Sequence, residues 1–312
     1  MIFLLPFRTG RPRIRIMKMT RKRVWPAFLI VLAGLHGVTA SAADGNRFAL
    51  KISGGIGRYA LGDINSYLEG SSQFRKDSLQ AAGYIADAEF ESFHGGREFA
   101  ISAWIPVSRH VHVILASGYI RVEKNRNGLN LNSSFSTLTN TFDHSISAFP
   151  LTLGLGCTWP VSGRFVFYVF SGGGIYFTKF AETGEATLVL MSGLPGYTSS
   201  WEADTKAAGL GCYGGIGLEL GVTGNISFVA EAGGRFAKIS GFSGGSRFTF
   251  NNSASEENFD LYYYEFLTSD LKKPYKALSL PNAERGYPLR EFRNGVIDLS
   301  GFSLRAGIKI VL

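Results

Sequence analysis

The sequence predicts an all-β fold: an eight-stranded antiparallel up-and-down transmembrane β-barrel with long extracellular loops. Three observations support this prediction. Apolar residues alternate with small or polar residues in eight segments, the period of two that is typical of strands with two different faces. Short and long connections between these segments alternate. Charged residues recur on one face of the segments, while apolar residues recur on the other.

Residues 1–42 have the composition of a secretory signal peptide. They contain a basic segment at 18–23, an apolar stretch at 25–38 and the small residues Ala40-Ser41-Ala42 at a candidate cleavage site. An uncleaved membrane anchor is the alternative, but the apolar stretch is short for a membrane span. We therefore expect cleavage, with residues 43–312 forming the barrel domain. Two later start sites are candidates: Met17 and Met19.

The rest of the chain is electrically balanced and poor in metal ligands. The leader holds eight of the 32 basic residues, which leaves 24 to match the 24 acidic residues. A neutral chain offers no basic surface to a nucleic-acid backbone, so we expect no nucleic-acid partner. Two cysteines and five scattered histidines predict no disulfide scaffold, no metal and no cofactor. Because a third strand separates Cys157 from Cys212, we expect two free thiols that face lipid.

Eight strand segments of roughly 10 to 17 residues account for most of the chain. Each combines β-branched or aromatic residues with period-two alternation, and helical periodicity is almost absent. A short helix at 63–76 is the one exception that we expect. The expected strands are 47–60, 97–106, 110–124, 144–158, 164–180, 207–221, 225–241 and 296–312.

The connections place all the short turns at one end of the strands. The tight turns are 106–109, 159–163 and 222–224, and the long connections are 61–96, 125–143, 181–206 and 242–295. Outer-membrane barrels have short periplasmic turns and long extracellular loops, whereas a soluble sandwich has no reason for this regularity.

The two faces are clearest in the hairpin formed by 207–221 and 225–241, and in the strand at 296–312. One face of these strands is apolar and belongs in lipid. Both faces of 110–124 and 164–180 are apolar, so their orientation stays open. The apolar face comprises Leu210, Cys212, Ile216, Leu218, Leu220, Ile226, Phe228, Ala230, Ala232, Phe236, Phe302, Leu304, Ala306, Ile308, Ile310 and Leu312.

The opposite face carries charges that a barrel interior accepts when they are paired. We expect these residues to form a structural charge cluster in the lumen: Lys51, Glu98, Glu219, Glu231, Arg235, Arg305 and Lys309. Glu231 should pair with Arg305, Lys309 or Arg235. Glu219 should pair with Lys51 or Lys309.

Four glycine-rich or aromatic stretches resemble small bacterial outer-membrane barrels of the OmpA, OmpW and opacity-protein type. They are Phe149-Pro150-Leu151-Thr152-Leu153-Gly154, Gly172-Gly173-Gly174-Ile175-Tyr176-Phe177, Gly214-Gly215-Ile216-Gly217-Leu218-Glu219 and Asp298-Leu299-Ser300-Gly301-Phe302. The resemblance implies a monomer in the outer membrane of a Gram-negative bacterium. Its partners would be outer-membrane lipid, lipopolysaccharide and the barrel-assembly machinery. The family's last strand commonly ends in an aromatic residue, whereas this one ends in Leu312.

Two groups of residues are candidates for a lipid-modifying hydrolase, an activity that some small outer-membrane barrels have. The groups are Asp143, His144 and Ser145, and Glu89, Glu91, Ser92 and His94. Adjacent residues on a strand point to opposite faces, so His144 and Ser145 cannot easily share a proton. We therefore expect solvated loop residues and no catalytic residue, and the hydrolase is the least favoured alternative.

The segment 242–295 is rich in aromatic residues and is a candidate surface for a ligand. The alternative, which we favour, is that it folds over the barrel mouth. Since an eight-stranded barrel is only wide enough for its own side chains, we expect a plugged polar lumen and a structural or surface-interaction role. A narrow conduit or a binding site for a small amphipathic molecule is the alternative function. The aromatic residues are Phe248, Phe250, Phe259, Tyr262, Tyr263, Tyr264, Phe266, Tyr275, Tyr287 and Phe292.

Overall fold

The computed structural model divides into two units, Met1–Gly45 and Asn46–Leu312, and the described residues all belong to the second. The signal peptide expected at 1–42 lies outside the described residues and stays a prediction. The structure describes residues 47–81, 86–89, 92–132, 136–190, 196–251, 253–267, 274–279 and 289–312.

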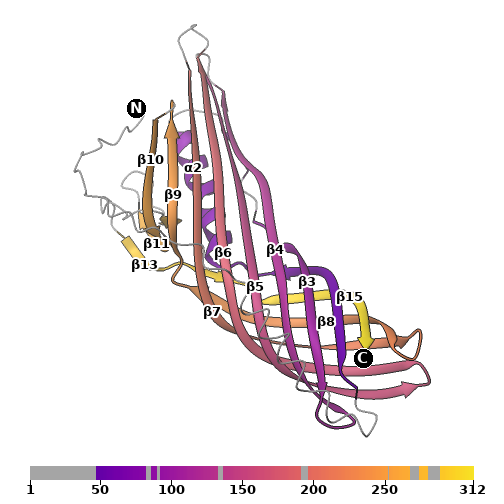
Figure 1. The fold of residues 1–312 in the computed structure, drawn as a ribbon. Coiled ribbons are helices and arrows are strands. Elements are labelled where there is room, and N and C mark those ends of the chain that lie inside the picture. The colour runs from indigo at the N-terminus through magenta and orange to yellow at the C-terminus, as the bar shows by residue number, and fades with distance from the viewer. Residues whose placement is uncertain are drawn as a thin grey trace. The chain divides into compact units, whose positions relative to one another are not determined.

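Eight antiparallel strands form a closed ring (Figure 1). Each strand pairs with the next one along the chain, and the last pairs with the first, from Ala49↔Val311 to Tyr59↔Gly301. This arrangement confirms the predicted eight-stranded antiparallel order. The strands are β1 (Ala49–Tyr59), β3 (Gly95–Pro106), β4 (Val111–Asn132), β5 (Ser136–Ser162), β6 (Phe165–Leu190), β7 (Tyr197–Gly221), β8 (Ile226–Ser240) and β15 (Gly301–Val311).

We call the end of the ring that carries the short turns the turn end, and the opposite end the loop end. The remaining elements lie at the loop end. Helix α2 directly follows β1, and β9 continues the pairing with β7 beyond the end of β8. Strand β11 is the centre of a separate three-stranded sheet with β12 and β13. These elements are α2 (Asp63–Ala81), β2 (Ala86–Glu89), β9 (Ser243–Phe250), β10 (Ser253–Asp260), β11 (Tyr262–Leu267), β12 (Pro274–Ser279), β13 (Leu289–Asn294) and β14 (Val296–Asp298).

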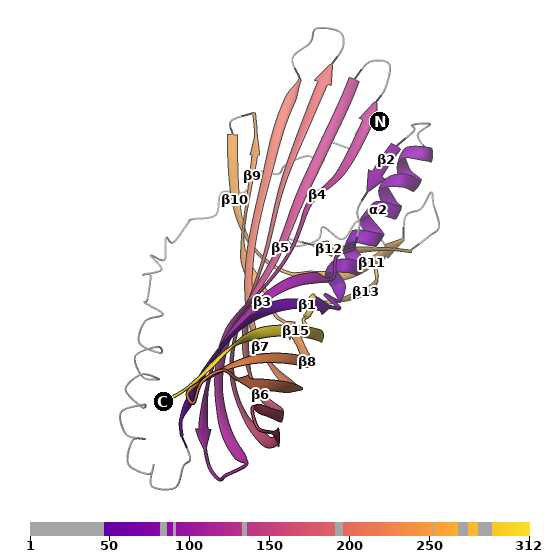
Figure 2. The same cartoon turned by 90° about the vertical axis from the view of Figure 1, so that its right-hand side faces the viewer.

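Two of the predicted long loops are wrong, because 125–143 and 181–206 are mostly strand. Strands β4 to β7 have 22 to 27 residues, whereas β1 and β15 have 11. In Figures 1 and 2 the long strands rise beyond the rest of the ring. Polar and β-branched residues continue the backbone ladder there, because ladder hydrogen bonds do not need an apolar face. The helix expected at 63–76 is confirmed and is longer than expected.

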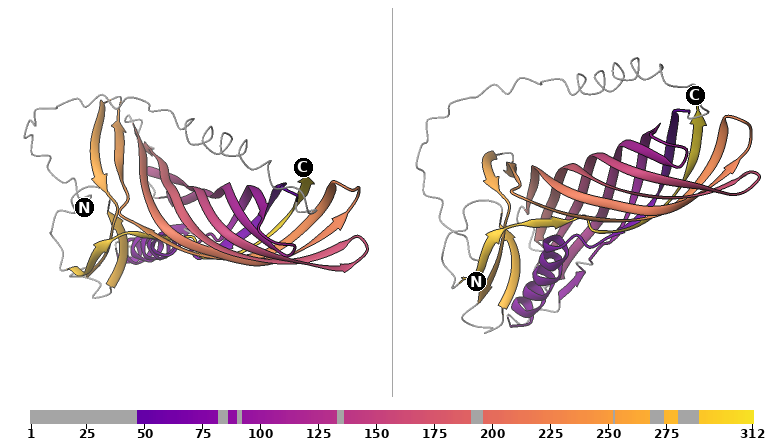
Figure 3. Two further views of the ribbon diagram at one scale, coloured as in Figure 1. Left: turned by 60° about the horizontal axis from the view of Figure 1, so that its bottom comes forward. Right: turned by 90° about the horizontal axis from the view of Figure 1, so that it is seen from below.

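The exposure of side chains alternates along the strands as the sequence predicts. Ile216 and Leu218 on β7 are 52% exposed, whereas Glu219 between the outward positions is only 5% exposed. The structure also resolves the two strands with two apolar faces. On β6, Ile175 and Phe177 point outward and Tyr176 points inward; β4 behaves likewise. Both faces are apolar because one forms the outside of the ring and the other packs aromatic residues inside it. Figure 3 shows the tilted strands side by side around the ring.

The interior has an apolar layer at each end. The turn-end layer contains Ala49, Trp104, Ile114, Tyr168 and Phe170. The loop-end layer joins α2 to the ring, since Ile64 and Leu68, one helical turn apart, pack in one cluster with inward residues of β4, β5, β6 and β8. Those ring residues are Ile120, Val122, Ile146, Ala148, Tyr176, Phe180, Ala237 and Ile239.

The seam between β1 and β15 should be sensitive to added volume. A Cβ atom at Gly307 would lie 2.0 Å from the carbonyl oxygen of Ile52 on the neighbouring strand. We expect Gly307→Ala to lower the free energy of unfolding by about 1 to 3 kcal/mol, because the strands must separate to admit the methyl group. Urea unfolding measures this change.

Gly95→Ala is the matched control for this substitution. Gly95 begins β3, and a Cβ atom there would meet nothing within 4 Å. Equal stability of the two variants would contradict a tight seam.

Candidate functional site

The seven charged residues expected in the lumen all lie inside the ring, and we call them the lumen cluster. They come from β1, β3, β7, β8 and β15, and every one occupies an inward position. Five are buried, and the side chains of Arg235 and Arg305 are 12% and 14% exposed. The cluster lies between the two apolar layers. Its members are Lys51, Glu98, Glu219, Glu231, Arg235, Arg305 and Lys309.

Glu231 is the most connected acid of the lumen cluster. It lies directly opposite Arg305 on the neighbouring strand, and the Arg305 Nη2 to Glu231 Oε2 distance is 3.2 Å. This is one of the pairs expected from the sequence. Glu231 also binds the ammonium group of Lys51, and the hydroxyl of Tyr168 donates to Glu231 Oε1 at 2.8 Å. The pair with Lys51 was not expected, because β1 and β8 come together only when the ring closes.

Lys51 and Lys309 occupy directly opposite positions on β1 and β15, so two like charges lie side by side. Different acids neutralise them. Lys309 Nζ donates to Glu219 Oε1 at 2.6 Å, one of the two pairs that the sequence offers for Glu219, while Lys51 binds Glu231 instead. Both ammonium groups also lie over the indole of Trp104, at 5.0 Å for Lys309 and 4.8 Å for Lys51, where the ring's negative face attracts a cation.

Glu98 forms a second centre nearer the loop end. Arg235 Nη1 donates to Glu98 Oε1 at 2.9 Å, and the hydroxyl of Tyr59 donates to the same oxygen. Arg305 Nη1 lies 3.9 Å from the other carboxylate oxygen, so Arg305 links the two centres. The sequence placed Glu98 in the lumen but named no partner for it, because two strands separate β3 from β8 in the ring.

The lumen cluster carries little uncompensated charge, and a small cavity lies beside it. Four basic and three acidic side chains give a net charge of one positive unit. The cavity beside Glu98, Arg235 and Arg305 has a volume of about 20 Å³, enough for roughly one water molecule. Because the carboxylates of Glu98, Glu219 and Glu231 are almost fully buried, each acid depends on its protein partners.

A cap formed by α2, β11, β12 and β13 covers the loop end of the ring. Tyr263 of β11 and Leu278 of β12 belong to the same apolar cluster as α2 and the ring. Arg293 of β13 binds Asp63, the first residue of α2, through two hydrogen bonds of 2.5 and 2.7 Å. These hydrogen bonds raise the pKa of the Arg293 guanidinium. Asp63 also accepts from the Val296 backbone N–H at 2.8 Å.

Strand β12 lies beside α2 in the cap (Figure 2), and a second polar contact joins the two elements farther along the helix. The hydroxyl of Tyr275 on β12 donates to Asp77 Oδ2 at 2.7 Å. Burial and the interaction with Asp77 raise the pKa of Tyr275 to about 12. These hydrogen bonds join α2 to β13 at Asp63 and to β12 at Asp77, so two points of the helix are attached to the rest of the cap.

The structure describes only part of the two candidate hydrolase groups. His144 is not the solvated loop residue that we expected: it is buried inside the extended part of β5, 3.3 Å from Glu182 Oε2. Ser145 follows on the opposite face of the strand. His94 Nδ1 lies 3.0 Å from the Tyr59 carbonyl oxygen, where it ties β3 to β1. The side chains of Glu89 and Glu91 lie outside the described residues.

The aromatic residues of 242–295 divide between the two roles considered. Phe259, Tyr263 and Tyr275 are buried, as expected of a segment that folds over the mouth. Phe248, Phe250 and Phe292 are exposed. Tyr287 lies outside the described residues. The segment therefore supplies both a cover for the ring and an exposed aromatic surface.

The described residues offer no metal centre and no helical span. Among them, no group of three or more His, Cys, Asp or Glu side chains could hold a metal ion. No helix in this part of the chain is long and apolar enough to cross a membrane. Cys157 and Cys212 are free thiols, and Cys212 is exposed on the outside of the ring.

Comparisons with known proteins find distant structural similarity. No family model matches the chain, and no curated protein matches it. It is similar to the outer membrane protein OprG from Pseudomonas aeruginosa, at 11% identity and a TM-score of 0.34, over 86% of this chain and 97% of that chain. It is also similar to the RagAB peptide transporter, at 9% identity and a TM-score of 0.16, over 85% of this chain and 41% of that chain. Likenesses this distant assign no function.

Removing the charge of Glu231 should destabilise the ring strongly. Glu231→Gln leaves Lys51 and Arg305 short of an anion in a nearly dry interior, so we expect a loss of about 3 to 5 kcal/mol in the free energy of unfolding. Urea unfolding of the purified protein measures it. Adding Lys51→Met should recover part of the loss, because the unpaired cation is then also gone.

Glu256→Gln is the control for this prediction. The side chain of Glu256 is 77% exposed on β10 and lies 4.0 Å from Arg247, so its loss should change stability by less than about 1 kcal/mol. Similar losses in the two variants would show that the lumen cluster does not stabilise the ring.

Proposed function

We propose that this chain is an outer-membrane β-barrel protein of a Gram-negative bacterium, with a structural or surface-interaction role and a closed lumen. The observation that carries the proposal is the inversion of burial around the closed ring. Large apolar side chains are exposed on the outside, while Lys51, Glu98, Glu219, Glu231 and Lys309 are buried on the inside. A soluble protein has the opposite distribution, whereas a membrane barrel requires this one.

The outer face has the continuity that lipid contact demands. Cross-strand pairing joins outward positions on five adjacent strands into one uncharged row, which runs without a break from β3 to β7. Four of its five members are large apolar residues that are between 38% and 77% exposed. An apolar surface this extensive is rare on a soluble monomer. The row is Ile101, Ser117, Leu151, Ile175 and Leu210.

Three layers support a closed lumen. The aromatic layer at the turn end, the lumen cluster and the apolar layer beneath the cap follow one another along the ring. Each layer contains side chains from opposite sides of the ring, so together they fill the interior that an eight-stranded barrel provides. This filling favours a structural or surface role over transport.

The exposed aromatic residues of the loop end indicate where a surface partner would bind. Phe250 packs on Tyr197 with ring centroids 5.4 Å apart, and Phe248 lies on the same strand. Exposed aromatic residues on a rigid sheet are effective binding residues, because little side-chain entropy is lost on contact. The proposal also includes a resemblance to the OmpA, OmpW and opacity-protein type and a monomeric state. It includes contact with lipopolysaccharide and with the barrel-assembly machinery.

Arginine on the outer face tests the membrane proposal. Ile216 lies near the middle of the outward apolar residues of β7, which run from Leu210 to Leu220. We expect Ile216→Arg to make folding into bilayers less favourable by about 2 to 4 kcal/mol. Val222→Arg is the control, since Val222 is a similarly exposed apolar residue (47%) in the adjacent tight turn. Equal effects would contradict a membrane-embedded outer face.

Electrical recording tests the closed lumen. In planar bilayers the reconstituted wild-type protein should show little or no steady conductance, because paired charges and aromatic side chains fill its interior. A large porin recorded in the same bilayers provides the positive control. Large, stable current steps from this chain would overturn the closed lumen and favour the narrow conduit.

A further inference from the structure

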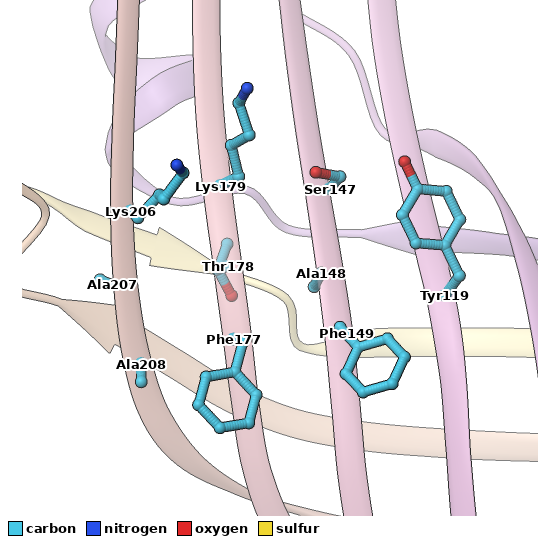
Figure 4. Close-up of a pocket in the computed structure, with 10 residues that line it drawn as sticks. All are labelled: Tyr119, Ser147, Ala148, Phe149, Phe177, Thr178, Lys179, Lys206, Ala207 and Ala208. Atoms are coloured by element: carbon cyan, nitrogen blue, oxygen red, sulfur yellow. The ribbon is translucent and has the colours of Figure 1, made fainter. Parts of the chain in front are cut away.

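A groove on the outer face of the ring combines basic and aromatic side chains. Its volume is about 400 Å³, and it lies over β4, β5, β6 and β7. Figure 4 shows Lys179 and Lys206 on neighbouring strands, with the phenyl rings of Phe149 and Phe177 on the turn-end side of them. The groove is outside the ring and shares no residue with the lumen cluster.

The two lysines belong to a row of five residues, four of them basic and one a serine, that crosses five adjacent strands. Each member is paired directly with the next: Arg97↔Arg121, Arg121↔Ser147, Ser147↔Lys179 and Lys179↔Lys206. All five occupy outward positions. We call the four charged members, Arg97, Arg121, Lys179 and Lys206, the basic row. Like charges directly opposite each other destabilise a sheet, so the row favours an external anion.

Carboxylates of the protein neutralise half of the basic row. Arg121 Nε donates to Glu123 at 2.7 Å, and Lys179 Nζ lies 2.6 Å from Asp204 Oδ2. Within the described part of the chain, Arg97 and Lys206 have no carboxylate within 4.0 Å. Two positive charges therefore remain for a ligand. Ser147 lies between the two halves of the row, where its hydroxyl could donate to an anion.

An aromatic row follows the basic row at a spacing of two residues on four of the five strands, and Ala208 takes the same position on β7. Phe99 pairs with Tyr119, and Phe149 pairs with Phe177, which pairs with Ala208. On every strand the basic row is on the loop-end side and the aromatic row on the turn-end side. Beyond the aromatic row comes the row of Ile101, Leu151, Ile175 and Leu210. The outer face thus changes from cationic to aromatic to aliphatic within four residues.

We infer that this groove binds a phosphate-bearing lipid of the leaflet at the loop end. The basic row would hold the phosphate groups, Phe149 and Phe177 would lie at the boundary, and the aliphatic row would contact the acyl chains. A soluble anion would use only the basic row and would leave the apolar part of the groove exposed. The inference rests on the membrane function proposed above.

Lipid binding by the refolded full chain in detergent micelles tests the inference. Native mass spectrometry compares diphosphorylated lipid A with the same lipid after removal of both phosphates. Wild type should bind the phosphorylated form about tenfold more tightly, because each lysine adds attraction to a surface anion. Inorganic phosphate in excess should not displace the lipid. Equal binding of the two lipids, or complete displacement by phosphate, would overturn the inference.

Variants of the two lysines locate the site. The double variant Lys179→Gln with Lys206→Gln should bind the two lipids within about twofold of each other. Lys238→Gln is the matched control: Lys238 is an outward lysine of β8 with a 56% exposed side chain, outside the basic row, and should keep the wild-type preference. The site would be overturned if only Lys238→Gln lost the preference for the phosphorylated lipid. It would also be overturned if the double variant kept that preference.

The membrane proposal and the lipid site fail in different ways. Heat-dependent electrophoretic mobility reports whether each variant is folded, and insertion into phosphatidylcholine vesicles reports whether the ring enters a bilayer. A chain that inserts but shows no phosphate preference contradicts the lipid site alone. A chain that folds without entering bilayers contradicts the membrane function and the site that rests on it. If the double variant is unfolded, Lys206→Gln alone gives the same comparison.

Discussion

The ring is organised by the need to neutralise charged side chains that little water can reach. Glu231 of β8 is the clearest case, since it binds Lys51 from β1, Arg305 from β15 and Tyr168 from β6. A shift of β8 by one residue would turn Glu231 to the apolar outer face and leave these partners without an anion. The ion pairs inside and the apolar surface outside therefore fix the same strand register.

Glycine makes this interior possible by giving tyrosine room to lie across a strand. Gly217 of β7 is paired with Tyr168 on one side and with Glu231 on the other. A Cβ atom at Gly217 would lie 2.2 Å from the Tyr168 ring, so only glycine lets the phenol extend over β7 to reach the carboxylate. This packing accounts for part of the abundance of glycine and aromatic residues in the sequence. Aromatic rings lie inside the ring of strands, and glycines such as Gly217 lie beneath them.

The sequence predicts most of the ring, because period-two alternation is a local property. It identifies the eight strands and the outward face of β7, β8 and β15. It also includes Arg305 among three candidate partners of Glu231, and Lys309 among two candidate partners of Glu219, on strands that are neighbours or nearly so. It does not predict the pairs of Lys51 with Glu231 or Glu98 with Arg235, because these depend on ring closure. The extension of β5 over 136–143 was also missed, since polar residues in a ladder have the composition of a loop.

The seam between β1 and β15 joins the first and last strands of the ring, and it pairs residues that are very distant in the sequence, such as Ala49 and Val311. Contacts between such distant residues carry a large loop-closure entropy, so the seam should be the last and slowest pairing to form. Until then Lys51 has no access to Glu231. Helix α2 follows β1, and β13 precedes β15. The hydrogen bonds between Asp63 of α2 and Arg293 of β13 therefore connect the same two ends of the chain. The cap therefore joins the same two ends of the chain as the seam, and we expect it to slow reopening of the closed ring.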